Sequence, residues 1–146
     1  MLQTWSYELF EAYLPGAVWN FSGKIEVSTD YETLFGRKSY VEQTAGGYYA
    51  ARIGILEYLS KENKQASALV LRFETPEYSK PLGVFVVRQA ARKTLSESYL
   101  KFSTKEEMIK TAKGLILNKF KYKIDNLLEQ SKLLKSLEQI KLNKFL

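Results

Sequence analysis

The sequence contains no cysteine and no histidine, and only three of its 146 residues are proline. The chain can therefore form no disulfide, and it has no thiol nucleophile, no imidazole base and no soft zinc ligand. Carboxylates, Lys, Ser, Thr, Tyr and Arg are left for chemistry, together with a hard cation such as magnesium. No carboxylate pair stands in a metal-motif context, so we predict no metal site and no cofactor. Whether the chain is an enzyme is left open.

Long hydrophobic runs are also lacking. No run approaches 18 apolar residues, and residues 1–10 carry no basic residue ahead of an apolar stretch. We therefore expect no membrane partner and no export signal, and we expect the protein to be cytoplasmic. A composition of 45% apolar and 26% charged residues excludes disorder for the bulk of the chain.

The net charge of +6 is distributed unevenly. Residues 1–103 hold 12 basic against 11 acidic residues, whereas residues 104–146 hold 10 Lys against 5 acidic residues. We therefore predict a compact α+β domain over 1–103 and a basic amphipathic helical extension over 104–146. The Lys residues fall mostly between apolar positions of helical spacing, which favours a solvated face, with DNA binding as the alternative.

The first forty residues predict a short helix and a hairpin. Apolar residues between Thr4 and Leu14 have a spacing near 3.6, and the pattern stops at Pro15-Gly16. This spacing predicts a helix. Ala17–Phe21 and Lys24–Ser28 are short runs around a glycine and could pair as a hairpin.

The middle of the chain predicts a helix followed by a strand. Ser39 and Glu42 form a capping-box pattern, and the apolar residues that follow, through Leu59, cover more than one stripe. A helix packed on several sides should therefore begin at Ser39 and end in the polar run 60–65. Ala66–Phe73 is an apolar run of strand length with β-branched and aromatic residues, which predicts the central strand.

Two further helical segments are predicted. Leu82–Leu95 has a proline before it and apolar residues three and four apart, although its β-branched residues leave a strand open for the first half. Thr104 and Glu107 form a second capping box ahead of one or two long amphipathic helices. The fold class is thus α+β: a small sheet covered by helices, with a long basic C-terminal helical extension.

The last eight residues, Q-I-K-L-N-K-F-L, match the spacing of a peptide that docks on DNA sliding clamps. One helical turn places Leu142 and Phe145 on the same side as an apolar plug, and the Gln139 amide can both donate and accept. Leu146 stands where an aromatic residue is usual, which predicts modest affinity. The alternative interpretation is the frayed last turn of an amphipathic helix.

A double glycine and three arginines form a second candidate site. Gly46 and Gly47 interrupt a helical pattern, which predicts a break, a close helix contact, or amides facing an anion. With Arg52, Arg88 and Arg92 they could hold a phosphate or nucleotide. Close packing is the commoner reason for such glycines and is favoured here.

Arg72 falls inside the predicted strand, and a buried arginine needs an acidic partner. Glu74, on the same side of the strand, and Glu57, on the preceding helix, are the candidates. A structural ion pair and an anion site are about equally supported.

Four separated blocks of residues stand in order between positions 5 and 88. They are W-S-Y-E-L (5–9) leading to L-P-G (14–16) and W-N (19–20); G-G-Y-Y-A-A-R (46–52) with L-E-Y-L (56–59); P-E-Y (76–78); and P-L-G-V-F-V-V-R (81–88). Together they resemble the C-terminal region of the Nre family of archaeal DNA-repair proteins. The resemblance implies a clamp-binding end and the sliding clamp PCNA as partner, and it transfers no catalytic residue.

Full-length members of that family are much longer, with an N-terminal region that is Cys-rich in some of them. We therefore expect this chain to be a fragment or a short paralogue. The leading hypothesis is a DNA-repair accessory protein recruited to the clamp through Gln139, Leu142, Phe145 and Leu146. A phosphate- or nucleotide-binding domain and a DNA-binding Lys-rich segment are the alternatives.

Overall fold

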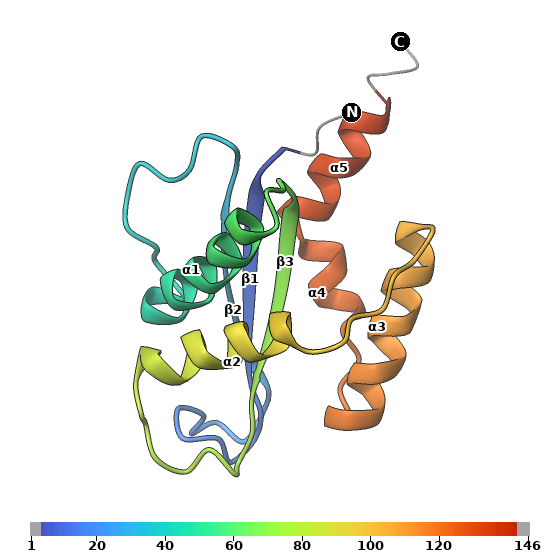
Figure 1. Cartoon of the computed structure of the whole chain (residues 1–146). Coiled ribbons are helices and arrows are strands. Elements are labelled where there is room, and N and C mark those ends of the chain that lie inside the picture. The colour runs from blue at the N-terminus through green and yellow to red at the C-terminus, as the bar shows by residue number, and fades with distance from the viewer. Residues whose placement is uncertain (1–3, 143–146) are drawn as a thin grey trace. The chain divides into compact units, whose positions relative to one another are not determined.

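The computed structural model describes residues 4–142, with side chains through residue 139. The chain divides between Glu97 and Ser98 into two compact units. In the described part, the first unit holds a three-stranded sheet and two helices, and the second holds three helices (Figure 1). The predicted α+β class is confirmed.

The sheet has the order β2-β1-β3. Strand β1 (Ser6–Tyr13) runs antiparallel to β2 (Glu26–Glu32) and parallel to β3 (Ser67–Glu74). The strand predicted at 66–73 is therefore present, but it lies at an edge, and β1 is the central strand. A parallel pair needs a crossover, which here runs through β2 and the first helix.

The helix predicted over Thr4–Leu14 is wrong, because these residues form β1. Every residue from Ser6 to Ala12 is buried, as suits a central strand with a partner on each side. The hairpin predicted for 17–21 and 24–28 is also wrong. Residues 17–21 form no strand, and β2 pairs with β1 instead.

Helix α1 (Ala45–Lys61) begins six residues later than the Ser39–Glu42 pattern predicts. The reason is a cap supplied from another element. The Asp30 carboxylate on β2 accepts hydrogen bonds from the backbone N–H groups of Gln43 and Thr44, which fixes the residues ahead of α1 outside the helix.

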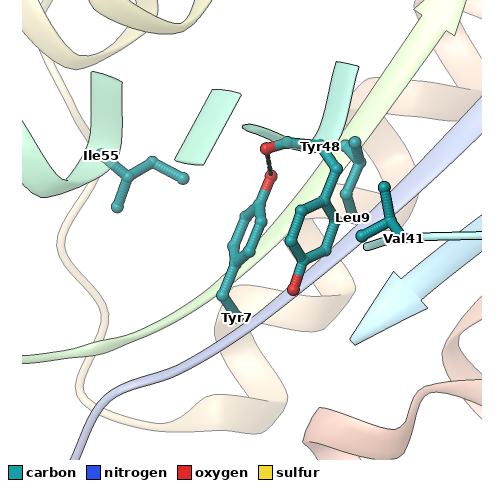
Figure 2. Packing of buried hydrophobic residues seen from close by; sticks show 5 residues of the cluster. All are labelled: Tyr7, Leu9, Val41, Tyr48 and Ile55. Atoms are coloured by element: carbon teal, nitrogen blue, oxygen red, sulfur yellow. Dashed lines mark hydrogen bonds between the residues drawn. The ribbon is translucent and has the colours of Figure 1, made fainter. Parts of the chain in front are cut away.

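The core of the first unit lies between α1 and the sheet. Tyr7 and Leu9 of β1 pack against Tyr48 and Ile55 of α1, with Val41 beside them (Figure 2). The rings of Tyr7 and Tyr48 are 4.7 Å apart, and the Tyr7 hydroxyl donates to the Tyr48 carbonyl oxygen at 3.1 Å (Figure 2). This bond lets a phenol be buried without leaving its hydroxyl unpaired.

Helix α2 (Val84–Ser96) packs on a second side of α1. Ala50 and Ala51 of α1 meet Val87 of α2, and a Cβ added at Gly54 would lie 3.2 Å from the Ala91 Cβ. The prediction of a helix packed on several sides is confirmed for α1. The strand alternative for the first half of α2 is wrong.

The second unit contains α3 (Lys105–Phe120), α4 (Asp125–Gln130) and α5 (Lys132–Leu142). Its described part is therefore three helices, where the sequence predicts one or two long ones. Lys121 takes a left-handed conformation at the end of α3, and Ser131 separates α4 from α5.

Local caps define the starts of two of these helices. The Thr104 hydroxyl oxygen accepts from the Glu107 N–H at 3.2 Å, as the second capping box predicts for its Thr half. The Ser131 hydroxyl oxygen accepts from the Leu134 N–H at 3.1 Å and caps α5 in the same way. Among the helices within residues 4–142, none has the length and apolar character needed to cross a membrane.

Candidate functional site

A pocket of about 400 Å³ lies in the first unit, where β1 and β3 end and α1 begins. Glu11 and Tyr13 of β1 and Arg72 and Glu74 of β3 form one wall. The first residues of α1 form another, and the loops before α2 contribute aromatic and apolar side chains. Ligands of proteins with parallel strands commonly bind at this edge of the sheet, beside a helix N-terminus.

The parallel register of β1 and β3 brings the charged residues together. Glu11 pairs with Arg72 in the register, and Tyr13 pairs with Glu74 two residues later. Since alternate residues of a strand face the same side, all four side chains project from one face of the sheet. Glu11 and Arg72 are 61 residues apart in the sequence, and only this pairing makes them neighbours.

Arg72 is held between two buried carboxylates. Its Nη1 donates to Glu11 Oε1 at 2.6 Å, and its Nη2 donates to Glu74 Oε1. Burial would lower the pKa of the Arg72 guanidinium, but the charges of Glu11 and Glu74 outweigh it and raise that pKa. The predicted pairing of Arg72 with Glu74 is confirmed, and the partner that the sequence did not indicate is Glu11.

Tyr13 completes this cluster. Its hydroxyl donates to Glu11 Oε2 at 2.8 Å, and burial and the Glu11 carboxylate both raise the pKa of Tyr13 well above its ordinary value. Both carboxylate oxygens of Glu11 thus accept a hydrogen bond. Glu74 differs, because its Oε2 atom is buried and has no hydrogen-bond partner among the described residues.

The two glycines lie in the wall of the pocket, in the first turn of α1. A Cβ added at Gly46 would lie 2.3 Å from Val84 Cγ1, and one added at Gly47 would lie 2.0 Å from Glu11 Oε1. Real Cβ atoms do not approach so closely, so no larger side chain fits at either position without a shift. The favoured interpretation, close packing, is confirmed, and α1 continues through both glycines without a break.

The three predicted arginines do not reach this pocket. Arg52 Nε donates to Glu32 Oε1 at 2.8 Å, and Arg92 makes two bonds to the Glu57 carboxylate, at 2.8 and 2.7 Å. Arg88 lies on α2, half-buried, and its Nε has no hydrogen-bond partner among the described residues. The phosphate-binding alternative requires the glycines and the arginines to converge, and the structure does not bring them together.

The partner of Arg52 belongs to a second buried cluster that the sequence did not indicate. Glu32 on β2 also accepts from Trp5 Nε1 at 2.6 Å and from the Tyr48 hydroxyl at 3.2 Å. These three donors are side chains of the first unit, and Glu32 is 3% exposed. The arrangement is a satisfied structural cluster and not an open site.

The predicted clamp-binding residues lie at the end of the second unit. Gln139 is exposed on α5, and Leu142 is the last residue of that helix. Phe145 and Leu146 lie outside the described residues.

Two of the Lys residues of the second unit are engaged in ion pairs within that unit. Lys105 pairs with Glu138 at 2.8 Å and Lys113 with Asp125 at 2.6 Å. Direct DNA binding by this segment stays a prediction. No group of acidic side chains in the described part of the chain is arranged to hold a metal ion.

Residues 32–145 match the family described as archaeal Nre, C-terminal. The match covers most of the chain. The chain therefore belongs to the Nre family. The family resemblance carried by the glycine, aromatic and proline blocks is thereby confirmed.

Three curated Nre relatives are similar over shorter stretches. The chain is 40% identical over 106 residues to the DNA repair protein NreB of Archaeoglobus fulgidus, which covers 73% of this chain and 27% of the relative. It is 41% identical over 90 residues to the DNA repair protein NreA of Haloferax volcanii, a match that covers 60% of this chain and 21% of the relative. It is 38% identical over 93 residues to the DNA repair protein NreA of A. fulgidus, a match that covers 64% of this chain and 24% of the relative.

This Nre chain therefore spans about a quarter of the length of the curated relatives that it matches. No solved structure is similar enough to count as a match.

Proposed function

We propose that this chain acts in DNA repair and is recruited to the replication sliding clamp, PCNA, through its C-terminal peptide. The DNA-repair part is supported by the names of the three relatives. The recruitment part is carried by one observation, the spacing of Gln139, Leu142, Phe145 and Leu146 at the end of the chain.

The described part of the peptide is consistent with docking. Helix α5 runs from Lys132 to Leu142, so the three-residue spacing between Gln139 and Leu142 falls within its last turn. Gln139 is exposed, and its amide is free to enter a polar pocket of a partner. Lys141 and Lys144 flank the apolar residues and would favour an acidic partner surface.

The mechanism that follows is tethering. Binding of the terminal peptide orders a short segment and raises the local concentration of the rest of the chain at DNA that carries the clamp. No catalytic residue is assigned by this proposal.

Calorimetry with an archaeal PCNA tests it. The intact chain should bind, and the Leu142→Ala/Phe145→Ala double variant should lose at least about tenfold in affinity, since the apolar anchors of such peptides dominate binding. Asn143→Ala, at a position the pattern leaves free, is the matched control and should bind as the unaltered chain does. Equal affinity of the double variant and the intact chain would overturn the proposal.

A further inference from the structure

One carboxylate oxygen in the wall of the pocket between β1, β3 and α1 has no hydrogen-bond partner among the described residues. The Glu74 side chain is 6% exposed; its Oε1 accepts from Arg72, and its Oε2 is the buried oxygen that no described residue pairs. Buried carboxylate oxygens are nearly always paired, and leaving one unpaired is costly. A ligand that offers an N–H group at this wall would supply the missing bond.

The charges around the pocket exclude a phosphate. Two carboxylates, Glu11 and Glu74, stand against the single guanidinium of Arg72, so the cluster carries one net negative charge. The Glu11 carboxylate also lies beside Gly47, close to where an anion at the first turn of α1 would sit. A phosphate in this position would be repelled.

The wall formed by the start of α1 makes the pocket unsuited to a simple cation. Ala45, Gly46 and Gly47 line the pocket with the first turn of α1, whose N–H groups have no acceptor within the helix and form its positive end. Donors and an acceptor are thus presented together. The ligand that uses both is an uncharged group carrying a donor and an acceptor side by side.

Aromatic side chains form the remaining wall. Trp19, which is 55% exposed, and Tyr78 line the pocket together with Tyr13. Exposed aromatic rings are the surfaces on which single-stranded bases stack. The volume of about 400 Å³ is within the range of small-ligand pockets.

We propose that this pocket binds an unpaired nucleobase that carries an exocyclic amino group, with Glu74 as the acceptor for that group and Trp19 as the stacking surface. Adenine, cytosine and guanine have such a group next to a ring nitrogen or an oxygen, and thymine has none. The assignment to a base in single-stranded DNA, as opposed to a free nucleoside, rests on the proposed role in DNA repair.

The experiment titrates the full chain with adenosine and with purine riboside, which lacks the amino group, and follows the Gly46 and Gly47 amide signals by NMR. Adenosine, added to at most a millimolar concentration, should shift both amide signals. Purine riboside should bind about tenfold more weakly, since one hydrogen bond to a charged group is lost. Short oligomers of dA and dT then distinguish a base in single-stranded DNA from a free nucleoside. Tighter binding of the dA oligomer than of adenosine assigns the site to single-stranded DNA.

Trp19→Ala and Phe21→Ala are the matched variants, because Phe21 lies in the same loop, is 90% exposed and does not line the pocket. Trp19→Ala should weaken adenosine binding at least about fivefold, whereas Phe21→Ala should leave it unchanged. Equal effects of the two variants would overturn the proposal, and so would no binding of adenosine. Tighter binding of arginine methyl ester than of adenosine would also overturn it, in favour of a basic side chain of a partner protein. None of these measurements involves the clamp, so the nucleobase proposal can be overturned while the clamp proposal stands, and the reverse.

Discussion

The carboxylate of Asp30, on β2, accepts two hydrogen bonds from Thr44, one from its backbone N–H at 2.8 Å and one from its hydroxyl at 2.9 Å. A third bond comes from the Gln43 N–H at 3.0 Å. Thr44 immediately precedes α1, and its own side chain caps no N–H group of the helix. The Asp30 carboxylate, on the sheet, instead pairs the N–H groups of the residues that lead into α1. Asp30 thereby fixes the position of α1 and of the two glycines in its first turn.

Asp30→Asn should lower the free energy of unfolding by about 1–2 kcal/mol, because an amide retains one acceptor oxygen and loses the charge that complements the helix N-terminus. Urea denaturation at neutral pH measures the change. Glu26→Gln is the control, since Glu26 lies on the same strand, is exposed, and loses the same charge. If Glu26→Gln destabilises the chain as much as Asp30→Asn does, the capping role is wrong.

The contribution of Asp30 should also depend on pH. Burial acts to raise the pKa of Asp30, but the hydrogen bonds from Thr44, Gln43 and Glu42 outweigh it and lower that pKa below its usual value. The stabilisation is then present above the ordinary aspartate pKa of about 4 and is lost as the pH falls through the lowered value. The stability difference between the unaltered chain and Asp30→Asn should be constant above about pH 5 and should narrow below about pH 4.

Gly47→Ala tests the close approach at the pocket wall. Alanine favours a helix over glycine by about 1 kcal/mol, but the added Cβ would overlap Glu11 Oε1, and Glu11 is fixed by Arg72 and Tyr13. The substitution should therefore destabilise the first unit by about 1–3 kcal/mol.

Gly114→Ala is the matched control for this substitution. Gly114 lies in α3, and a Cβ there meets nothing within 4 Å, so alanine should stabilise its helix by up to about 1 kcal/mol. Thermal denaturation followed by circular dichroism compares the two variants. A stabilising Gly47→Ala would mean that Glu11 moves aside freely and that the wall is not rigid.

The outcome at β1 shows why the first element could not be assigned from spacing. Trp5, Leu9 and Tyr13 are each four residues apart, which is close to one helical turn and is also an even number that returns to the same face of a strand. The stop at Pro15-Gly16 ends a strand as well as a helix. Only the neighbours on each side of β1 decide between the two, and these come from distant parts of the sequence.

The pocket was predictable only in its local parts. Two residues on one strand face, such as Arg72 and Glu74, can be paired from the sequence, and a double glycine in a helical pattern correctly indicated close packing. Glu11 could not be found in this way, because its position beside Arg72 depends on the parallel register of two strands. The start of α1 likewise depended on Asp30, 14 residues before Thr44, and this contact overrode the local pattern at Ser39.

The two core tyrosines whose rings are in contact, Tyr7 and Tyr48, predict the behaviour of the chain in alkali. Burial raises the pKa of Tyr7 and of Tyr48 far above their ordinary value, and the nearby Glu32 carboxylate acts in the same direction on both. Because the unfolded chain ionises these groups near pH 10, the stability that they contribute is complete below that pH and is lost as the pH rises above it.

An alkaline titration followed by tyrosine absorbance and circular dichroism together checks this expectation. Part of the absorbance change should appear only in the cooperative step in which the fold is lost, and Tyr7→Phe should reduce the size of that step. Ionisation of all ten tyrosines of the chain before any loss of structure would contradict it.

Arg72→Met should destabilise the first unit by about 3 kcal/mol or more, because it leaves the Glu11 and Glu74 carboxylates buried side by side without their cation. The physical cause is the uncompensated charge, so the triple variant Arg72→Met/Glu11→Gln/Glu74→Gln should recover most of the loss. Arg92→Met is the control: Arg92 also makes two hydrogen bonds to carboxylate oxygens, both on Glu57, but this pair is exposed, so its removal should cost far less. Urea denaturation of the four proteins decides the matter. If the triple variant is no more stable than Arg72→Met alone, the arginine contributes through packing and the charge balance of the pocket is not what holds this edge of the sheet.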